Sequence, residues 1–373
     1  MEASRREVGR GRRGAGLLAT AGALLLASSA VAAPGDWEPL PEEPPSPDHN
    51  PTTEPKVELG KKLYFDPRLS ETGTVSCNTC HNVMEGGDDG RPTSMGVHGR
   101  IGPRNAPTVW NAAFHSTQFW DGRAKNVEEQ AKGPLLAHPE MGMPNHGKVM
   151  ERVREVPGYV AEFEEVFGGE DPVTIENAVK AIGAFERTLI TPNSAYDRYA
   201  KGNKDALTEQ QKRGLETFKE VGCTSCHSGP AFNGPQMNMP EGQGFFQKFP
   251  QFTDNKYVEK YNLMADPGRA RGTEKEAHKH QWKVPTLRNV ELTAPYFHNG
   301  AVKTLPEAVR VMGKTQLNKD LSEQQVADIV AFLESLTGEF PAIEMPRLPS
   351  KPGESIIKGA KPASAFEEGG SNH

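Results

Sequence analysis

The sequence predicts a mostly α-helical protein built from two similar halves. Each half has the same order of features: a short helical pattern, a cysteine-containing motif, a long loop region and an amphipathic closing helix. With 373 residues, the chain is long enough for two domains. Its 38 glycines and 31 prolines predict extensive loops between the helices.

Four helical segments follow from the spacing of apolar residues. The first half has helices near 59–65 and 175–189, and the second half near 210–219 and 326–336. In both closing helices the apolar residues recur every three or four positions, and each contains Ala-Phe-x-x-x-Leu. We expect the early and the late helix of each half to pack together.

The first 33 residues have the features of a cleaved export signal. A cluster of arginines precedes an apolar run over 15–31, and Ala-Val-Ala at 30–32 offers a cleavage site between small residues. A membrane anchor is the alternative, but the run is short and rich in alanine. The mature chain is therefore predicted to be exported and to have no membrane span.

The rest of the chain divides by composition. Residues 34–55 are rich in proline and predict an extended linker. The two domains are predicted at 56–200 and 201–347, with their junction near 193–205, and 348–373 form a flexible tail. The net charge of −6 comes from mixed signs, so no basic nucleic-acid surface is predicted.

The cysteines give the most specific signal in the sequence. All four belong to two C-x-x-C-H motifs: Cys77-Asn-Thr-Cys80-His81 and Cys223-Thr-Ser-Cys226-His227. Two thiols at this spacing can reach the two vinyl groups of one porphyrin, and the adjacent imidazole can bind its iron. Disulfides, a zinc site or a thiol redox pair are the alternatives. A histidine after both pairs and an export signal favour two covalently attached c-type haems, one in each of two cytochrome c-like domains.

The second protein ligand of each iron decides whether a haem transfers electrons or reacts. Met312 precedes the last helix, where a cytochrome c places its methionine ligand, whereas His298 is a weaker candidate. The first half has no methionine in the equivalent place. Its loop contains His98. Two roles stay open for this residue: a reversible iron ligand and a surface histidine.

Several longer segments resemble the bacterial dihaem cytochrome c peroxidases. The resemblance extends from about residue 59 to 348 and rests on blocks in the same order: Phe65-Asp-Pro-Arg-Leu-Ser, Gly102-Pro-Arg-Asn-Ala-Pro-Thr-Val, Gln118-Phe-Trp-Asp-Gly-Arg-Ala, Gln130-Ala-Lys-Gly-Pro and Leu292-Thr-Ala-Pro-Tyr-Phe-His-Asn-Gly. It implies a low-potential peroxidatic haem held by His81, and a high-potential haem held by His227 and Met312. Trp120 matches the tryptophan between the two haems.

The resemblance also implies roles for residues that spacing alone does not single out. Glu140 matches the distal glutamate of the peroxidatic haem, and Gln130 the distal glutamine. Asn105, with the backbone carbonyls of Thr293 and Pro295, matches a calcium site, and all-oxygen coordination suits this hard cation. His98 matches the displaceable distal ligand, although it stands one position later than in the family's usual Gly-His loop.

The implied activity is reduction of hydrogen peroxide with electrons from a small soluble cytochrome c or copper protein in the periplasm. Homodimers are frequent in the family. Two alternatives remain. The related tryptophan-tryptophylquinone maturation enzymes oxidise protein side chains, but they have tyrosine where Met312 stands here. A dihaem electron carrier without catalysis needs neither Glu140 nor Trp120.

Overall fold

The computed structural model describes residues 38–351, and the predicted export signal and most of the predicted tail lie outside them. The described chain is mostly α-helical, as the sequence predicts, and has one small two-stranded sheet. Within it, no helix is long and apolar enough to cross a membrane. The elements are α1 (Glu54–Phe65), α2 (Cys77–Cys80), α3 (Val127–Leu136), α4 (His146–Arg154), α5 (Pro157–Phe167), α6 (Ile175–Thr188), α7 (Ala195–Ala200), α8 (Glu209–Val221), α9 (Lys256–Lys260), α10 (Ala270–Thr273), α11 (Leu305–Leu317), α12 (Glu323–Glu334), β1 (Phe246–Lys248) and β2 (Gln281–Lys283).

The four predicted helices form close to their expected limits because each has clear boundary signals. Pro55 lies in the first turn of α1, a position that proline favours. Capping boxes start α8 at Thr208 and α12 at Ser322. Gly222, with a φ of 103°, ends α8 in the left-handed conformation and leads directly into the second cysteine motif.

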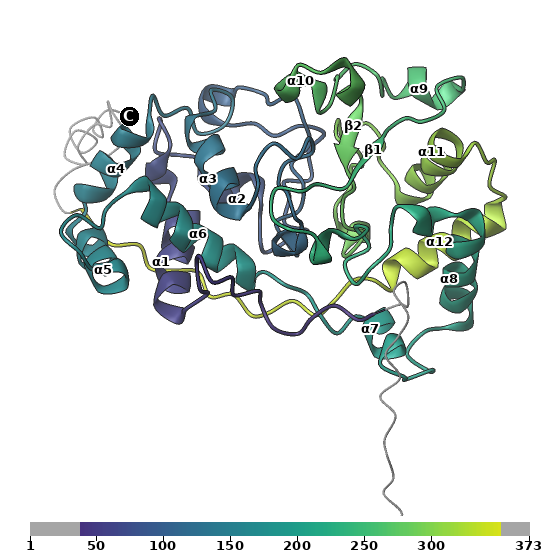
Figure 1. Cartoon of the computed structure of the whole chain (residues 1–373), viewed down its shortest axis with the longest axis horizontal. Helices are drawn as coiled ribbons and strands as arrows, with labels where there is room; N and C mark the ends of the chain where they lie inside the picture. The colour runs from purple at the N-terminus through teal and green to yellow at the C-terminus, as the bar shows by residue number, and fades with distance from the viewer. Residues whose placement is uncertain (1–37, 352–373) are drawn as a thin grey trace, which may run out of the picture. The chain divides into compact units, whose positions relative to one another are not determined.

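The expected packing of early on late helix is present in both halves (Figure 1). In the first half, α1 packs on α6, and the rings of Tyr64 and Phe185 meet edge to face with centroids 5.2 Å apart. In the second half, α8 packs on α12, and the rings of Phe218 and Phe332 lie 5.3 Å apart. Each pair belongs to its own buried apolar cluster, so each half has a core of its own.

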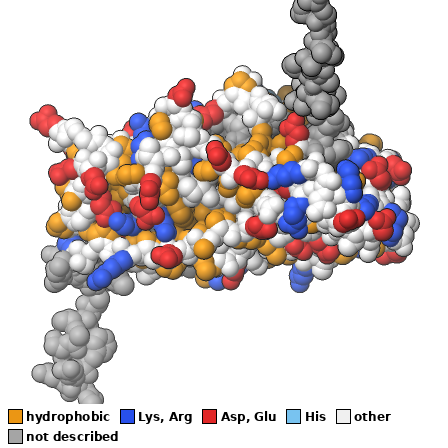
Figure 2. All heavy atoms as spheres, turned by 90° about the horizontal axis from the view of Figure 1, so that it is seen from below, with side chains coloured by type: hydrophobic (Ala, Val, Ile, Leu, Met, Phe, Trp, Pro, Cys, Tyr) orange, Lys and Arg blue, Asp and Glu red, His pale blue; other side chains and the backbone are white. Residues whose placement is uncertain are grey.

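Two extended segments connect regions that are distant in sequence (Figure 1). Before α1, Leu40 donates its backbone N–H to Asp197 Oδ1 at 2.9 Å. After α12, the carbonyl of Pro349 accepts a hydrogen bond from Arg68 Nη1 at 2.8 Å. The first described residues thus contact the region around α7, and the last described residues return to the first half. On the face in Figure 2, acidic and basic side chains are interspersed with apolar areas.

A glycine permits the close helix contact in each half. A Cβ on Gly60 of α1 would lie 1.8 Å from the carbonyl oxygen of Ala181, and one on Gly214 of α8 would lie 1.9 Å from that of Asp328. Because these are backbone atoms inside helices, they cannot move aside. We expect Gly60→Ala or Gly214→Ala to destabilise the protein by about 3 kcal/mol, measured as a lower thermal midpoint. Gly272→Ala, at an exposed helical position with nothing within 4 Å, is the matched control and should leave the midpoint nearly unchanged.

Candidate active site

The first motif opens into a cavity of about 420 Å³, called cavity A here. Thr79 Oγ1 accepts a hydrogen bond from the backbone N–H of Ser76, which fixes the start of the short helix α2. That helix carries both cysteines of the motif, and its last hydrogen bond places His81 beside them. The predicted residues that line cavity A are Cys77, Cys80, His81, Asn105, Trp120, Gln130 and Glu140.

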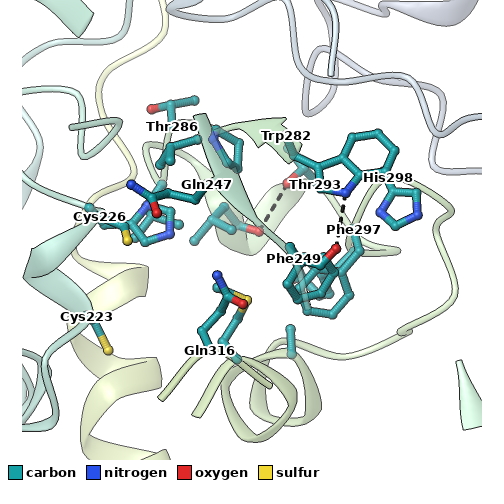
Figure 3. A pocket seen from close by; sticks show the side chains of 18 of the residues that line it. Cys223, Cys226, Gln247, Phe249, Trp282, Thr286, Thr293, Phe297, His298 and Gln316 are labelled. Atoms are coloured by element: carbon teal, nitrogen blue, oxygen red, sulfur yellow. Dashed lines mark hydrogen bonds between the residues drawn. The ribbon is translucent and has the colours of Figure 1, made fainter. Parts of the chain in front are cut away.

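The second motif opens into a cavity of about 260 Å³, called cavity B. Figure 3 looks into it and shows Cys223 and Cys226 on one side and Trp282 and His298 on the other. α11 contributes Met312 to the wall. The predicted residues that line cavity B are Asn105, Trp120, Cys223, Cys226, His227, Thr293, Pro295, His298 and Met312.

Both motif histidines are oriented in the same way. His81 Nδ1 lies 2.9 Å from the carbonyl oxygen of Pro107, and His227 Nδ1 lies 2.9 Å from that of Phe232. A carbonyl can only accept, so each Nδ1 donates and each Nε2 keeps its lone pair. Burial also lowers the pKa of both histidines, which favours the neutral ring that binds metals. Such second-shell hydrogen bonds orient haem-ligating histidines, so the residues fit a haem in each cavity.

The alternatives for the cysteines fit less well. All four cysteines are free thiols, and the two pairs line different cavities. Burial raises the pKa of Cys77, Cys80 and Cys223, so these three disfavour the thiolate form that zinc requires. Between residues 38 and 351, no group of three or more His, Cys, Asp or Glu side chains is placed to hold a metal ion.

The two cavities differ at the position of Met312. Each half has a short hairpin, with bridges between Gln118 and Ala124 and between Tyr296 and Val302, that leads into a helix. Counted from the starts of α3 and α11, the place of Met312 in the second half is taken by Pro134 in the first, which lines cavity A. Proline offers no side-chain ligand. The asymmetry between the halves is therefore built into equivalent helices.

Glu140 and Gln130 provide polar groups on the wall of cavity A. Gln130 lies on α3, whose N-cap Asn126 accepts a hydrogen bond from the backbone of Glu129. Burial raises the pKa of Glu140 above its ordinary value, and the positive charge of Arg123 opposes this shift. Glu140 therefore keeps its proton to a higher pH than an exposed glutamate does.

His98 lies outside both cavities. Its neighbour Val97 is buried and donates its backbone N–H to the carbonyl of Glu140 at 2.8 Å, so Val97 takes the inward position of this loop. His98 has a φ of 57°, and its Nε2 lies 3.2 Å from Glu71 Oε2 near the surface. The structure thus brings Glu140, but not His98, to His81. Val97 follows Gly96 directly and takes the buried position, so His98, one residue later, is turned toward the surface.

Trp120 stands between the two cavities and lines both of them. Its Nε1 donates to the carbonyl of Asn105 at 2.9 Å, and its own carbonyl accepts a hydrogen bond from the backbone of Lys283. Asn105, Thr293 and Pro295, the residues predicted for calcium, all line cavity B.

A charged network near Trp120, which the sequence did not reveal, links the two halves. Arg104 binds Asp121 at 2.6 Å and Asp266 at 2.8 Å. Its guanidinium also lies over the ring of Trp282, which stacks on His298 with centroids 4.1 Å apart. Burial lowers the pKa of His298 to about 4, so this ring is neutral. No local pattern marks such a network, because its members come together only in the folded chain.

The fold and the two cavities define a protein with two sites suited to covalently bound haem. The chain belongs to the family of di-haem cytochrome c peroxidases, whose family model matches residues 54–205. It is 45% identical to the cytochrome c551 peroxidase of Nitrosomonas europaea over 79% of this chain and 83% of that protein. The cytochrome c551 peroxidase of Pseudomonas aeruginosa is 44% identical over 84% of this chain and 88% of its own length.

More distant relatives include proteins of another name. The methylamine utilization protein MauG of Methylorubrum extorquens is 36% identical over 83% of this chain and 86% of that protein. Among solved structures, a MauG-like protein associated with microbial copper homeostasis matches with a TM-score of 0.70 and 29% identity, covering 84% of this chain and 99% of that one. The family membership implies two c-type haems, and the curated relatives support a peroxidase.

Proposed function

We propose that the protein reduces hydrogen peroxide to two molecules of water, using two protons and two electrons from a small exported redox protein. The observation that carries the proposal is the difference between the cavities. His81 shares cavity A with Glu140, Gln130 and a proline, whereas His227 shares cavity B with Met312. One site therefore leaves room for a small substrate beside polar groups, and the other offers two iron ligands.

In this proposal, residues 56–200 form the peroxidatic domain and residues 201–347 the electron-transfer domain. Cys77 and Cys80 attach one haem, and Cys223 and Cys226 the other. His81 holds the first iron, and His227 and Met312 hold the second. When bound, the first haem supplies the iron that binds peroxide, and the second supplies a centre that stores an electron.

Glu140 would move a proton between the two oxygen atoms of peroxide. It accepts the proton from one oxygen and donates it to the other, so that the leaving group is water rather than hydroxide. Positioned proton transfer of this kind contributes about 10²- to 10⁴-fold to the rate. Gln130 would orient the substrate through its amide, and the buried wall around both residues limits the access of bulk water.

The donor is proposed to be a small soluble cytochrome c or copper protein in the periplasm. The function is tested by mixing the haem-loaded protein with peroxide and a reduced small cytochrome c, and following oxidation of the cytochrome. We expect one peroxide to be consumed for every two molecules of cytochrome oxidised. A protein that exchanges electrons with the cytochrome but ignores peroxide would instead be a plain carrier.

Oxidation of protein side chains is the second candidate, because relatives named MauG cover most of the chain. Met312 counts against it, since the family resemblance implies tyrosine at that position in such enzymes. EPR spectra of the oxidised and the half-reduced protein distinguish the cases. We expect one iron with two protein ligands and one whose sixth position opens. The family resemblance supports three further proposals. These are His98 as a displaceable iron ligand, a calcium ion at Asn105, Thr293 and Pro295, and a homodimer.

Trp120 is proposed to support electron transfer between the haems, because it lines both cavities. Trp120→Phe keeps an aromatic ring but loses the indole and its hydrogen bond to Asn105. We expect a lower kcat with cytochrome as donor, while the first reaction of the reduced protein with peroxide keeps its stopped-flow amplitude. Equal loss of both signals would assign Trp120 to packing alone.

A further inference from the structure

Lys283 is a buried cation on the wall of cavity B. It ends strand β2, and its side chain is 7% exposed. Its backbone N–H donates to the carbonyl of Trp120 at 2.9 Å, which fixes this residue beside the wall that the two cavities share. Cavity B includes Lys283 among its lining residues, together with His115, on whose pKa the charge of Lys283 acts.

The other buried cations of the described chain have carboxylate partners. Arg288 pairs with Asp197 at 2.7 Å, and both side chains are fully buried. Arg187 pairs with Glu128. For Lys283, no carboxylate of residues 38–351 lies within 4.0 Å of Nζ. Burial and the positive charge of Lys283 lower the pKa of the nearby His115 well below its ordinary value, so this ring is neutral and supplies no counter-charge.

A buried ammonium group without a counter-ion is unfavourable, and burial alone lowers the pKa of Lys283 to about 7. An anionic group in cavity B would remove this penalty. The ionised groups of a haem are its two propionate carboxylates, which lie on the porphyrin edge away from the two vinyl groups. Cys223 and Cys226 would hold the vinyl edge. Trp282, the strand neighbour of Lys283, lies across the cavity from these cysteines (Figure 3).

We propose that Lys283 binds a propionate carboxylate of the haem in cavity B, orients that haem, and raises its reduction potential. The inference rests on the proposed placement of this haem. A fixed positive charge near the porphyrin favours the reduced form, which carries one positive charge fewer than the oxidised form. Lys283 would therefore be a positioning residue that helps the second haem to store an electron.

The test is a spectroelectrochemical titration of the haem-loaded protein at pH 8, where propionates are ionised. We expect Lys283→Met to shift the reduction equilibrium of the second haem about tenfold toward the oxidised form, which corresponds to about 59 mV for one electron. Lys283→Arg keeps the charge and should restore most of the wild-type potential. The first haem should keep its potential in each variant.

Lys248→Met is the matched control, because Lys248 is an exposed lysine on the paired strand β1. Equal potentials for Lys283→Met, Lys248→Met and wild type would overturn the proposal. If the Lys283→Met variant does not accumulate, resonance Raman spectra of the Lys283→Arg variant test the contact with the propionate. Propionate bending bands that shift from their wild-type positions support the contact, and unchanged bands refute it. Haem content and peroxide turnover are measured separately, so failure of the peroxidase proposal remains distinguishable.

Discussion

Glu140→Gln is expected to lower kcat for peroxide reduction by about 10²- to 10⁴-fold while both haems stay attached. Glutamine has nearly the same shape and fills the same place in cavity A, but its amide cannot accept and return a proton. The haem absorption spectra and both reduction potentials should therefore stay close to wild type. The measurement is steady-state turnover with a reduced small cytochrome c, together with the haem spectra of the same sample.

Glu151→Gln is the control for this substitution. Glu151 lies on the exposed side of α4 in the same half and pairs with Lys148 at the surface, so its loss removes the same charge away from cavity A. Turnover of this control should equal that of wild type. Wild-type turnover in Glu140→Gln would exclude Glu140 as the group that transfers the proton.

The pH dependence of the wild-type protein follows from the same carboxyl group. Glu140 must be ionised to accept the first proton, and burial raises its pKa above the ordinary value of 4.5. As pH rises, the ionised fraction rises, so kcat/KM should rise with it on the acid side of the profile and then level off. The Glu140→Gln variant should lack this limb, whereas Glu151→Gln should retain it.

The parts of the site that the sequence predicts well are those encoded by local patterns. The C-x-x-C-H motifs predict that the cysteines and the histidine of each motif share one site, and in the structure those of each motif line one cavity. The apolar spacing of the helices predicts that the early and late helices of each half pack together, and the contacts of Tyr64 with Phe185 and of Phe218 with Phe332 lie in these interfaces. Gly60 and Gly214 could have been suspected at the same crossings, since both lie four residues before the aromatic ring.

The parts that the sequence does not reveal depend on contacts between distant segments. Lys283 looks like an ordinary strand lysine until the fold buries it beside cavity B. Arg104 finds Asp266 far along the chain. His98 shows the opposite difficulty. Its neighbour Val97 is buried, so the register of the loop turns the histidine outward even though the surrounding residues follow the family pattern.

Met312→His is expected to lower the reduction potential of the second haem by on the order of 0.1 V, a part of the roughly 0.8 V range that axial ligands span. A thioether stabilises reduced iron better than an imidazole does. Met312 lies in α11 on the wall of cavity B with His227, so a histidine there keeps two protein ligands. The variant should still bind both haems, but the second would no longer take an electron readily from the donor, and turnover should fall.

Potentiometric titration of Met312→His, with each haem followed at its own absorption maximum, measures this effect. Met264→His supplies the control, because Met264 is 37% exposed and does not line cavity B. An unchanged potential in Met312→His would remove Met312 as an iron ligand. The consequence would reach further, because the proposed division of labour requires one haem that is closed by protein ligands and one that is open. Pro134 leaves cavity A without a thioether at the equivalent helix position, so the difference between the two haems would then need another source.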